Sequence, residues 1–401
     1  MTCGLINKVI RLPIARCFAI ICFFCVLDPS FALAALSGVS NAVPATDYAA
    51  FWAGSRLLIN GGNPYSPVEV FELQRSVGIS ASKPLLMWSP PWTLSFVLPF
   101  GAMDVLFSQF SWLLLHVFLI LVSARKLWVI YGQSERNSYL PWIVTLTFIP
   151  VWFVLILGQI SPLILLGIVG FLHFEKKKSC FLAGVSTTLI AVKPHLVYLF
   201  WIGLILWTWN QRRWRVALGA ILAGIAVSAI PAIIDPAVYS QYVEMYRNPG
   251  QSTPFELPAP SLGSLLTLSV PHGNLPIQFL PPLLGTLWFL WHWRRYKDRW
   301  DWSEQMPIVL LVSLVLSVYA WTYDQVILLP AVIQGLVWST RKDAPWYRNW
   351  LLLSYGTINA LYLVLKTVLV SDYYYFWLAP AFLLIYSSYS RTRSLPNTAS
   401  P

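Results

Sequence analysis

One carboxylate and one lysine interrupt apolar segments, where an unpaired charge is costly and either a functional role or an ion-pair partner is expected, and a second carboxylate stands before a predicted helix. Asp47 precedes an aromatic segment, Asp324 interrupts an apolar one, and Lys193 interrupts another just before Pro194. The ammonium group of such a lysine is a compact point charge that suits a phosphate. The alternatives are structural. Asp324 could pair with a cation such as Lys366, and Lys193 could snorkel to a membrane interface.

Two neighbouring positions carry weaker signals. His195 follows Lys193-Pro194 and could assist a site there, although a single His beside a Pro is little evidence. Gln159 belongs to Gly158-Gln159-Ile160-Ser161, which looks like a tight turn between antiparallel spans. Satisfying that turn could be its only role.

The elements that must position these residues are membrane helices. Of the 401 residues, 57% are hydrophobic and only 11% are charged, whereas about a quarter of a soluble protein is charged. The mean hydropathy is +0.63, and the 21 Trp and 19 Tyr suit a membrane–water interface. The net charge of +11 comes from small basic clusters between apolar segments, so we expect an orientation signal and no nucleic-acid partner. The five cysteines show no disulfide or metal spacing.

The pattern predicts an all-α, polytopic transmembrane bundle of about twelve spans, in a single domain over residues 1–401. The first span, 13–36, resembles a signal peptide but is long enough to remain as an uncleaved helix. Two long outer loops, 37–104 and 235–275, interrupt the spans. The first loop is predicted to carry short amphipathic helices, one of them begun by a capping box at Ser66-Pro67-Val68-Glu69. The other predicted spans are 105–124, 140–157, 160–174, 180–192, 195–209, 216–234, 277–293, 308–321, 326–338, 351–370 and 375–389.

The basic residues orient this bundle. With both termini in the cytoplasm, 21 of the 27 Lys and Arg fall in inner loops, as the positive-inside rule requires. The count holds only if the segment after Trp88-Ser89-Pro90-Pro91 is short or re-entrant rather than a full span. The helix breaks then lie on the outer side, which predicts a site open to that side. The basic residues left there are Arg56, Arg75, Lys83, Lys193, Arg247 and Lys366.

Asp47 is predicted to begin a short helix that lies on the membrane surface and ends at Gly61-Gly62. Its aromatic and apolar face consists of Tyr48, Phe51, Trp52, Ser55, Leu58 and Ile59. Asp47, or Thr46 beside it, could therefore be no more than the N-cap. Position alone leaves both the cap and a chemical role open.

Several short motifs occur in an order that resembles glycosyltransferase family 87, a family of polyprenyl-phosphate-dependent membrane enzymes in the GT-C superfamily. Each motif alone is unspecific, and their order over most of the chain carries the resemblance. Family members usually have Tyr in place of Trp88 and Asn in place of Ser161, which leaves the donor specificity open. The motifs are Asp47 after the first span, Gly61 to Tyr65, Trp88 to Pro91, Gly158-Gln159 with Ser161, Lys193-Pro194-His195, Ser261-Leu262 and Tyr323-Asp324.

The resemblance implies an integral membrane glycosyltransferase with a GT-C fold, in the plasma membrane. It would move a sugar from polyprenyl phosphate to an acceptor hydroxyl on the non-cytoplasmic face, with inversion and without a nucleotide or other cofactor, and no metal ligand is assigned. Asp47 matches the family's catalytic acid position, where it would act as general base, kept ionised by the helix N-terminus. Lys193 would stabilise the leaving phosphate. Further substrate-binding candidates are Arg56, Gln159, His195, Asp324 and Lys366.

The expected partners are a polyprenyl-phosphate-linked sugar, a glycan or glycolipid acceptor and membrane lipids. The alternative is a transporter or flippase of lipid-linked or amphipathic substrates, but no internal repeat is evident and the polar positions lie towards one face. Motifs for nucleotide phosphates, zinc proteases, serine hydrolases and paired CxxC cysteines are absent from the sequence.

Overall fold

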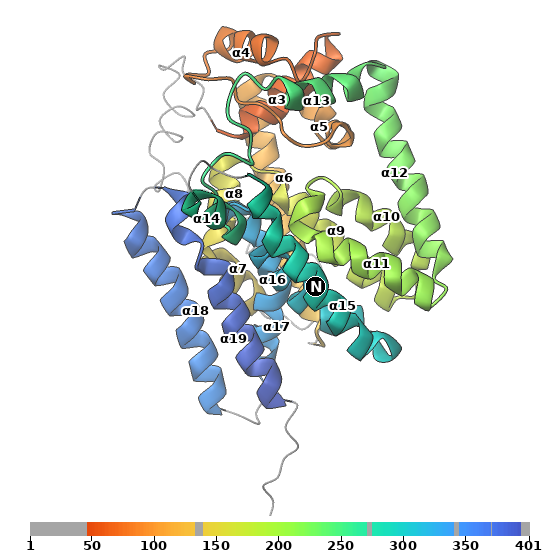
Figure 1. Cartoon of the computed structure of the whole chain (residues 1–401), viewed down its shortest axis with the longest axis vertical. Coiled ribbons are helices and arrows are strands. Elements are labelled where there is room, and N and C mark those ends of the chain that lie inside the picture. Colours follow the sequence, from red (N-terminus) through yellow and green to blue (C-terminus); the bar gives the residue numbers. More distant parts are fainter. Residues whose placement is uncertain (1–45, 133–138, 271–274, 341–344, 370, 394–401) are drawn as a thin grey trace, which may run out of the picture.

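The computed structural model describes residues 46–132, 139–270, 275–340, 345–369 and 371–393. These residues form seventeen α-helices and six 3-10 helices, without a strand, as the all-α prediction requires (Figure 1). The predicted first span, 13–36, lies outside the described residues.

Four short helices gather at one end of the molecule and form what we call the upper layer (Figure 1). They are α3 (Tyr48–Ile59), α4 (Pro67–Ser76), α5 (Leu94–Gly101) and α13 (Val238–Arg247). The two predicted outer loops supply all four. The longer helices extend away from this layer, so the layer covers one end of the bundle.

Helix α3 begins after Asp47 and ends at Asn60, followed by Gly61 with a φ of +77°, so its predicted start and stop are confirmed. The prediction of one buried face was wrong, since every residue from 48 to 55 is buried. Helix α5 packs closely here, because a Cβ placed on Gly101 would lie 2.5 Å from Cβ of Ser55. The helix is thus packed inside the upper layer rather than laid on a surface.

Helix α4 confirms half of the predicted capping box. The hydroxyl of Ser66 accepts from the backbone N–H of Glu69 at 3.3 Å, and Pro67 occupies the first turn. The carboxylate of Glu69 does not reach back to Ser66. It accepts from the backbone N–H of Asn63 at 2.9 Å and so ties the preceding turn to the helix.

Two helices are long and apolar enough to cross a membrane, α6 (Val105–Ile130) and α12 (Trp214–Ile234). A bent pair, α7 (Leu140–Thr147) and α8 (Ile149–Leu157), makes a third candidate. The described residues therefore show a helical membrane protein, but not about twelve spans. The remaining longer helices are α9 (Ser161–Lys176), α10 (Cys180–Ile190), α11 (Tyr198–Asn210), α15 (Leu280–Tyr296), α16 (Trp302–Val315), α17 (Leu329–Ser339), α18 (Pro345–Lys366) and α19 (Leu378–Arg393).

The predicted span 140–157 is not straight. Helices α7 and α8 meet at an angle of 67°. Phe148 is extended between them, and Pro150 stands in the first turn of α8, where its missing N–H costs no helical hydrogen bond. The extended Phe148 and the following Pro150 therefore account for the bend.

Short 3-10 helices replace α-helix at several predicted span ends. Segment η2 (Pro194–Val197) precedes α11, and η5 (Thr322–Leu328) precedes α17. Predicted span 308–321 is too long, because α16 ends at Val315. The other short elements are η1 (Pro91–Thr93), α14 (Leu262–Ser269), η3 (Leu275–Phe279), η4 (Lys297–Arg299) and η6 (Asp372–Tyr375).

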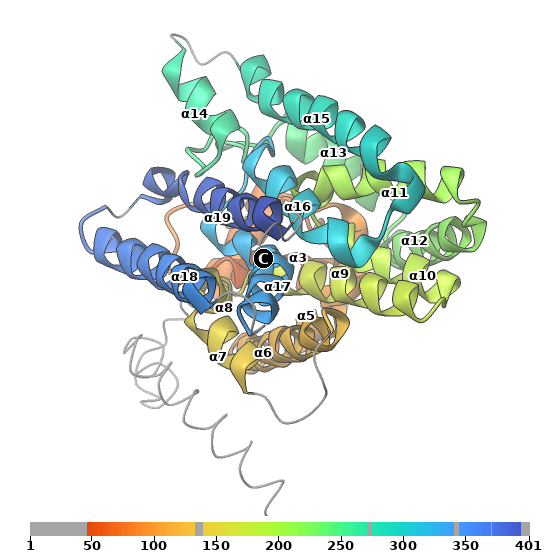
Figure 2. The same cartoon turned by 90° about the horizontal axis from the view of Figure 1, so that it is seen from below.

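Seen from below, α18 and α19 lie at one side of the molecule and α10 and α12 at the other (Figure 2). Helices α9, α16 and α17 lie between these two sides. The 3-10 breaks η2 and η5 contact α16, and η5 also contacts α8 and α9. The irregular segments that carry the candidate residues therefore meet in the centre of the bundle.

Candidate functional site

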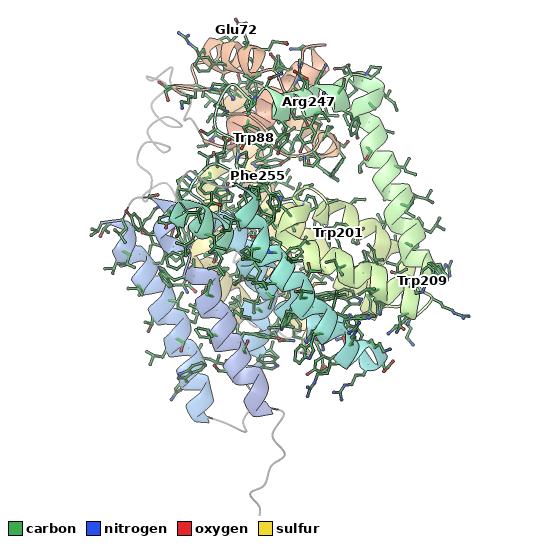
Figure 3. The ribbon with its side chains drawn as sticks, viewed as in Figure 1. Glu72, Trp88, Trp201, Trp209, Arg247 and Phe255 are labelled. Atoms are coloured by element: carbon green, nitrogen blue, oxygen red, sulfur yellow. The ribbon has the colours of Figure 1, made fainter. Side chains whose placement is uncertain are left out.

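A cavity of about 1000 Å³ lies between the upper layer and the longer helices. Residues from several parts of the chain line it: the start of α3, the loop 83–90, the turn after α8, α13 with the loop after it, and the breaks around η2 and η5, together with Phe279 and Asp372. Figure 3 shows Trp88 and Phe255, both lining residues, where the upper layer meets the longer helices. Of the predicted site residues, Asp47, Gln159, Lys193 and His195 line the cavity.

Four predicted residues form one chain of hydrogen bonds. The ammonium group of Lys193 donates to Asp324 Oδ1 at 2.9 Å and to Gln159 Oε1 at 3.0 Å. The amide nitrogen of Gln159 donates to Asp47 Oδ2 at 2.8 Å. Residues from four separate segments are thus held in one polar chain at the cavity wall.

Asp324 is the buried end of this chain, with a side-chain exposure of 1%. The hydroxyl of Ser161 donates to Oδ1 at 2.6 Å, and the backbone N–H of Trp321 donates to Oδ2 at 3.1 Å. The predicted pairing of Asp324 with Lys366 was wrong, because Asp324 forms its ion pair with Lys193. Because Asp324 is buried and accepts from three donors within the protein, its role is structural.

Asp47 occupies the N-cap position of α3, but its side chain makes no capping hydrogen bond. Thr46 does not cap the helix with its hydroxyl either, since that oxygen accepts from Gln109 at 3.3 Å. The cap interpretation therefore fails for both side chains. The carboxylate of Asp47 faces Gln159 instead.

The electrostatics of Asp47 also differ from the expectation. Burial raises the pKa of Asp47, and the hydrogen bond from Gln159 and the charge of Lys193 lower it by less. The carboxylates of Asp324 and Asp372 add to the rise. The expected lowering by the helix N-terminus is outweighed, because the side chain is desolvated between the upper layer and the bundle.

Gln159 belongs to the predicted turn, and its side chain also takes part in the hydrogen-bonded chain. Gly158 ends α8 with a φ of +66°, and its carbonyl accepts from the indole N–H of Trp112 at 2.8 Å, so the tight turn is confirmed. The side chain of Gln159 then bridges Asp47 and Lys193. Its amide orients one carboxylate oxygen of Asp47, while Oδ1 has no hydrogen-bond partner among the described residues.

Lys193 does not snorkel to a membrane interface. Its side chain is only 12% exposed, and the ammonium group lies 4.9 Å from the centre of the Tyr323 ring. Two of its three N–H donors serve Asp324 and Gln159. The third remains for a ligand in the cavity.

His195 lies against the ring of Tyr319, with the ring centres 4.3 Å apart. Its Nε2 has no hydrogen-bond partner among the described residues. The side chain lines the cavity next to Lys193, so a ligand could use this nitrogen.

The other two predicted cations lie outside the polar chain. Arg56 donates to the carbonyl of Gly101 at 3.1 Å and does not line the cavity. Lys366 pairs with Asp372 at 2.7 Å and lies 5.1 Å from the centre of the Tyr375 ring. Both contacts are structural.

Asp372 was not predicted from the sequence, but it lines the cavity and forms an ion pair with Lys366. The available signal was an acid directly after a predicted span, six positions from a lysine. Lys83 was also not selected, although it was placed on the outer side, and it lines the same cavity.

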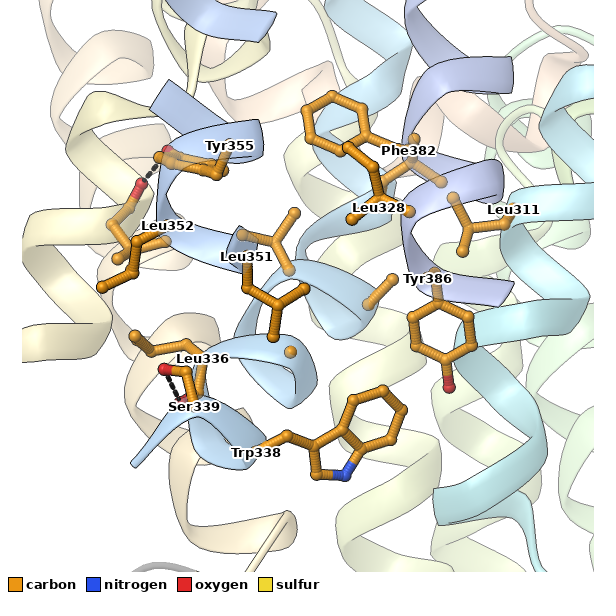
Figure 4. A pocket seen from close by; sticks show the side chains of 15 residues that line it. Leu311, Leu328, Leu336, Trp338, Ser339, Leu351, Leu352, Tyr355, Phe382 and Tyr386 are labelled. Atoms are coloured by element: carbon orange, nitrogen blue, oxygen red, sulfur yellow. Dashed lines mark hydrogen bonds between the residues drawn. The ribbon is translucent and has the colours of Figure 1, made fainter. Parts of the chain in front are cut away.

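A second, much smaller cavity of about 70 Å³ lies among α17, α18 and α19 (Figure 4). Its wall is made mostly of aliphatic and aromatic side chains, with Ser339, Tyr355 and Tyr386 as its polar members. None of the described residues that line it is charged. Its described lining can contact apolar groups but contains no acid, base or cation for catalysis. In the described parts of the chain, no three His, Cys, Asp or Glu residues gather as a metal site would require.

Comparison with known proteins adds one finding. The sequence profile of glycosyltransferase family 87 matches residues 89–318, more than half of the chain. The matched part contains Gln159, Lys193 and His195, whereas Asp47 and Asp324 lie on either side of it. Among curated proteins and among solved structures, nothing matches.

Proposed function

Because the chain belongs to glycosyltransferase family 87, we propose that it moves a sugar from a polyprenyl-phosphate donor to an acceptor hydroxyl, with Asp47 as general base. The family supports a transferase over the transporter or flippase considered from the sequence. The reacting groups would meet in the cavity of about 1000 Å³, which has room for a sugar and a phosphate together.

The hydrogen-bonded chain Asp47–Gln159–Lys193 carries this proposal. It joins a carboxylate without a capping role to a lysine with a free N–H donor, on one cavity wall. Inverting transfer needs such a pair, a base for the incoming hydroxyl and a cation for the leaving phosphate. Gln159 would keep the base oriented.

The proposed step is a single displacement. Asp47 takes the proton of the acceptor hydroxyl while the acceptor oxygen bonds to the anomeric carbon. The bond from that carbon to the phosphate oxygen breaks, and its electron pair leaves with the lipid phosphate. Attack from the face opposite the leaving group inverts the anomeric centre. Since the leaving group is already an anion, fixed positive charge suffices to stabilise it, and no general acid is required.

The membrane arrangement is part of the proposal. We place about twelve spans in the plasma membrane, with both termini in the cytoplasm and the upper layer on the outer side. The inner clustering of Lys and Arg supports this orientation. The acceptor would then enter from the aqueous side, and the lipid tail of the donor would lie among the helices.

The test is transfer from a synthetic polyprenyl-phosphate sugar by the purified Asp47→Asn variant. Asn accepts hydrogen bonds but cannot take a proton at neutral pH, so we expect a loss on the order of a hundredfold to ten-thousandfold in rate. The matched control is Asp104→Asn. Asp104 caps α6 by accepting from Leu106 and Phe107, and Asn caps about as well as Asp.

Thermal melts separate loss of chemistry from loss of fold. The raised pKa of Asp47 means that the folded protein binds this proton more tightly than the unfolded chain. The associated stability is present at low pH and is lost as the pH rises through the folded pKa. At pH 7, removing the charge should therefore leave the melting temperature unchanged or slightly higher. Transfer by Asp47→Asn within a few-fold of wild type would refute the base assignment.

A further inference from the structure

Four charged residues of the described chain line the cavity, and two of them form ion pairs. Lys193 pairs with Asp324, and Asp372 pairs with Lys366. Asp47 and Lys83 remain, and neither has an oppositely charged group within 4.0 Å among the described residues. Among the described lining residues, the anion outside an ion pair is Asp47, the proposed base, and the cation outside an ion pair is Lys83.

Lys83 is exposed, but the chain around it is held in place. The fully buried Gln74 of α4 donates to the carbonyl of Leu85 at 2.9 Å and accepts from its N–H at 3.0 Å. The same amide donates to the carbonyl of Ala49 in α3 at 3.4 Å. One buried side chain therefore fixes the Lys83 loop relative to the helix that begins at Asp47.

Aromatic rings adjoin this loop. The hydroxyls of Tyr242 and Tyr246 in α13 donate to the carbonyl of Trp88 at 3.3 and 3.2 Å. The rings of Trp88 and Tyr246 meet edge to face, with their centres 5.4 Å apart. Burial raises the pKa of both tyrosines, so their hydroxyls stay protonated and the wall stays uncharged. Phe255 extends the wall beside Tyr246.

We propose that this wall, with Lys83 at its edge, is the acceptor subsite and takes a saccharide that carries an anionic substituent. The inference rests on the proposed function and names its acceptor class. Aromatic faces carry partial negative charge and attract the C–H bonds on the flat side of a sugar ring. Lys83, which forms no ion pair with the described residues, supplies a cation for a phosphate or carboxylate group on that sugar.

Charge also sets the direction in which the saccharide lies. Its anionic group is attracted to Lys83 and repelled by Asp47, so the opposite end of the sugar is directed at the base. The wall belongs to the upper layer and the loops next to it, on the proposed aqueous side. A water-soluble sugar approaches from there, whereas an isoprenoid tail would remain among the lipids.

The experiment uses the full protein in lipid nanodiscs, because sugar-based detergents would compete. Saturation-transfer NMR reports which sugar C–H protons lie against protein protons. The probes are the methyl glycosides of glucose, mannose and galactose, each with and without a 6-phosphate. We expect the phosphorylated form of at least one sugar to bind about tenfold more tightly than the neutral form.

The variants separate the two parts of the subsite. Lys83→Gln should abolish the preference for the phosphorylated form and leave binding of the neutral form unchanged. Tyr246→Leu should weaken both forms equally, and Tyr246→Phe, which keeps the ring, should weaken them less. Lys177→Gln, in a predicted inner loop, is the matched control and should behave as wild type. Thermal melts exclude unfolded variants.

Two results would overturn the proposal. One is the absence of any phosphate preference in wild type, or its survival in Lys83→Gln. The other is a loss of farnesyl phosphate binding in Lys83→Gln, which would assign Lys83 to the donor instead. If wild type binds the glycosides as expected but not farnesyl phosphate, the acceptor subsite stands and the polyprenyl-phosphate donor is refuted.

Discussion

At the scale of single residues, Asp47 and Asp104 show that an N-cap position alone does not decide whether the side chain caps the helix. Both precede a helix, and both fit the preference for Asp at this place. Asp104 accepts from two backbone N–H groups of α6, whereas Asp47 turns to Gln159. The difference comes from the neighbours that tertiary packing brings to each carboxylate.

The pH dependence of transfer is the first prediction at this scale. Burial raises the pKa of Asp47 above the ordinary value of 3.8, and only the ionised form can take a proton. The rate should therefore fall as the pH is lowered, with a midpoint above 3.8. The measurement is kcat/KM against pH, with melts to exclude acid unfolding. A flat profile down to pH 4 would count against Asp47 as the base.

The second prediction concerns Lys193 and its buried partner. Lys193→Ala alone would leave Asp324 buried and unpaired, at a cost of about 3–5 kcal/mol. The informative variant is therefore Lys193→Ala combined with Asp324→Asn. If Lys193 holds the donor phosphate, this protein should fold and bind farnesyl phosphate at least tenfold more weakly by calorimetry.

The control is Asp324→Asn alone, which keeps the cation and should retain binding. Lys193→Arg should retain part of the farnesyl phosphate affinity, because charge matters more than shape for a point contact. Equal affinities of the double variant and wild type would remove Lys193 from the donor site.

At the scale of elements, the site is built where helices stop. Gln159 follows the end of α8, Lys193 precedes η2, and Asp324 lies within η5. Prolines contribute to these breaks, since Pro194 begins η2 and Pro330 lies in the first turn of α17. Backbone and side-chain polar groups become available at such ends, and buried polar groups need partners there.

Gly158 provides the prediction for this scale. It has a positive φ, and a Cβ at this position would lie 2.6 Å from Cβ of Tyr48, the residue after Asp47. Gly158→Ala should therefore displace the start of α3 from Gln159 and lower transfer at least tenfold. The left-handed conformation alone costs roughly 1–2 kcal/mol.

Gly132→Ala isolates that conformational cost, because Gly132 also has a positive φ but no atom of the described residues within 4 Å of the added Cβ. It should lower the melting temperature and leave transfer unchanged. Equal transfer by the two variants would show that the contact with Tyr48 does not position the site.

At the scale of the whole molecule, the upper layer and the bundle together make the cavity. Trp92 of η1 donates to the carbonyl of Ala191 at 2.9 Å, and Ser95 of α5 donates to the carbonyl of Val227 at 2.5 Å. These bonds join the upper layer to α10 and α12 across 99 and 132 positions of sequence. The Ser95 bond also satisfies the carbonyl that Pro231 leaves free in α12.

Topology is the prediction for this scale. Single cysteines at Asn63 and Ser252, in a cysteine-free variant, should react with an impermeant thiol reagent added to intact cells. A cysteine at Lys177 should react only after permeabilisation, because the inner basic clusters place it in the cytoplasm. Labelling of Lys177→Cys in intact cells would contradict the outward-facing site.

The amino-acid sequence by itself determined the class of the protein and its local elements. Composition alone excludes a soluble chain, since too few residues are charged. The ends of α3, the Ser66 cap and the turn at Gly158 were predictable because neighbouring residues decide them. Lys193 and Asp324 could be selected singly, because a charge in apolar surroundings is costly wherever the chain folds. Asp47 was selected by its place after the first predicted span and by the resemblance to the family.

Only the tertiary structure decided which of these residues meet. Lys193 and Asp324 are 131 positions apart, and Asp47 and Gln159 are 112 apart, so no local pattern links them. The choice of Lys193 over Lys366 as the partner of Asp324 depends on how η2 and η5 pack around α16. The direction of the pKa shift of Asp47 likewise depends on burial by segments distant in sequence, which outweighs the local effect of its helix.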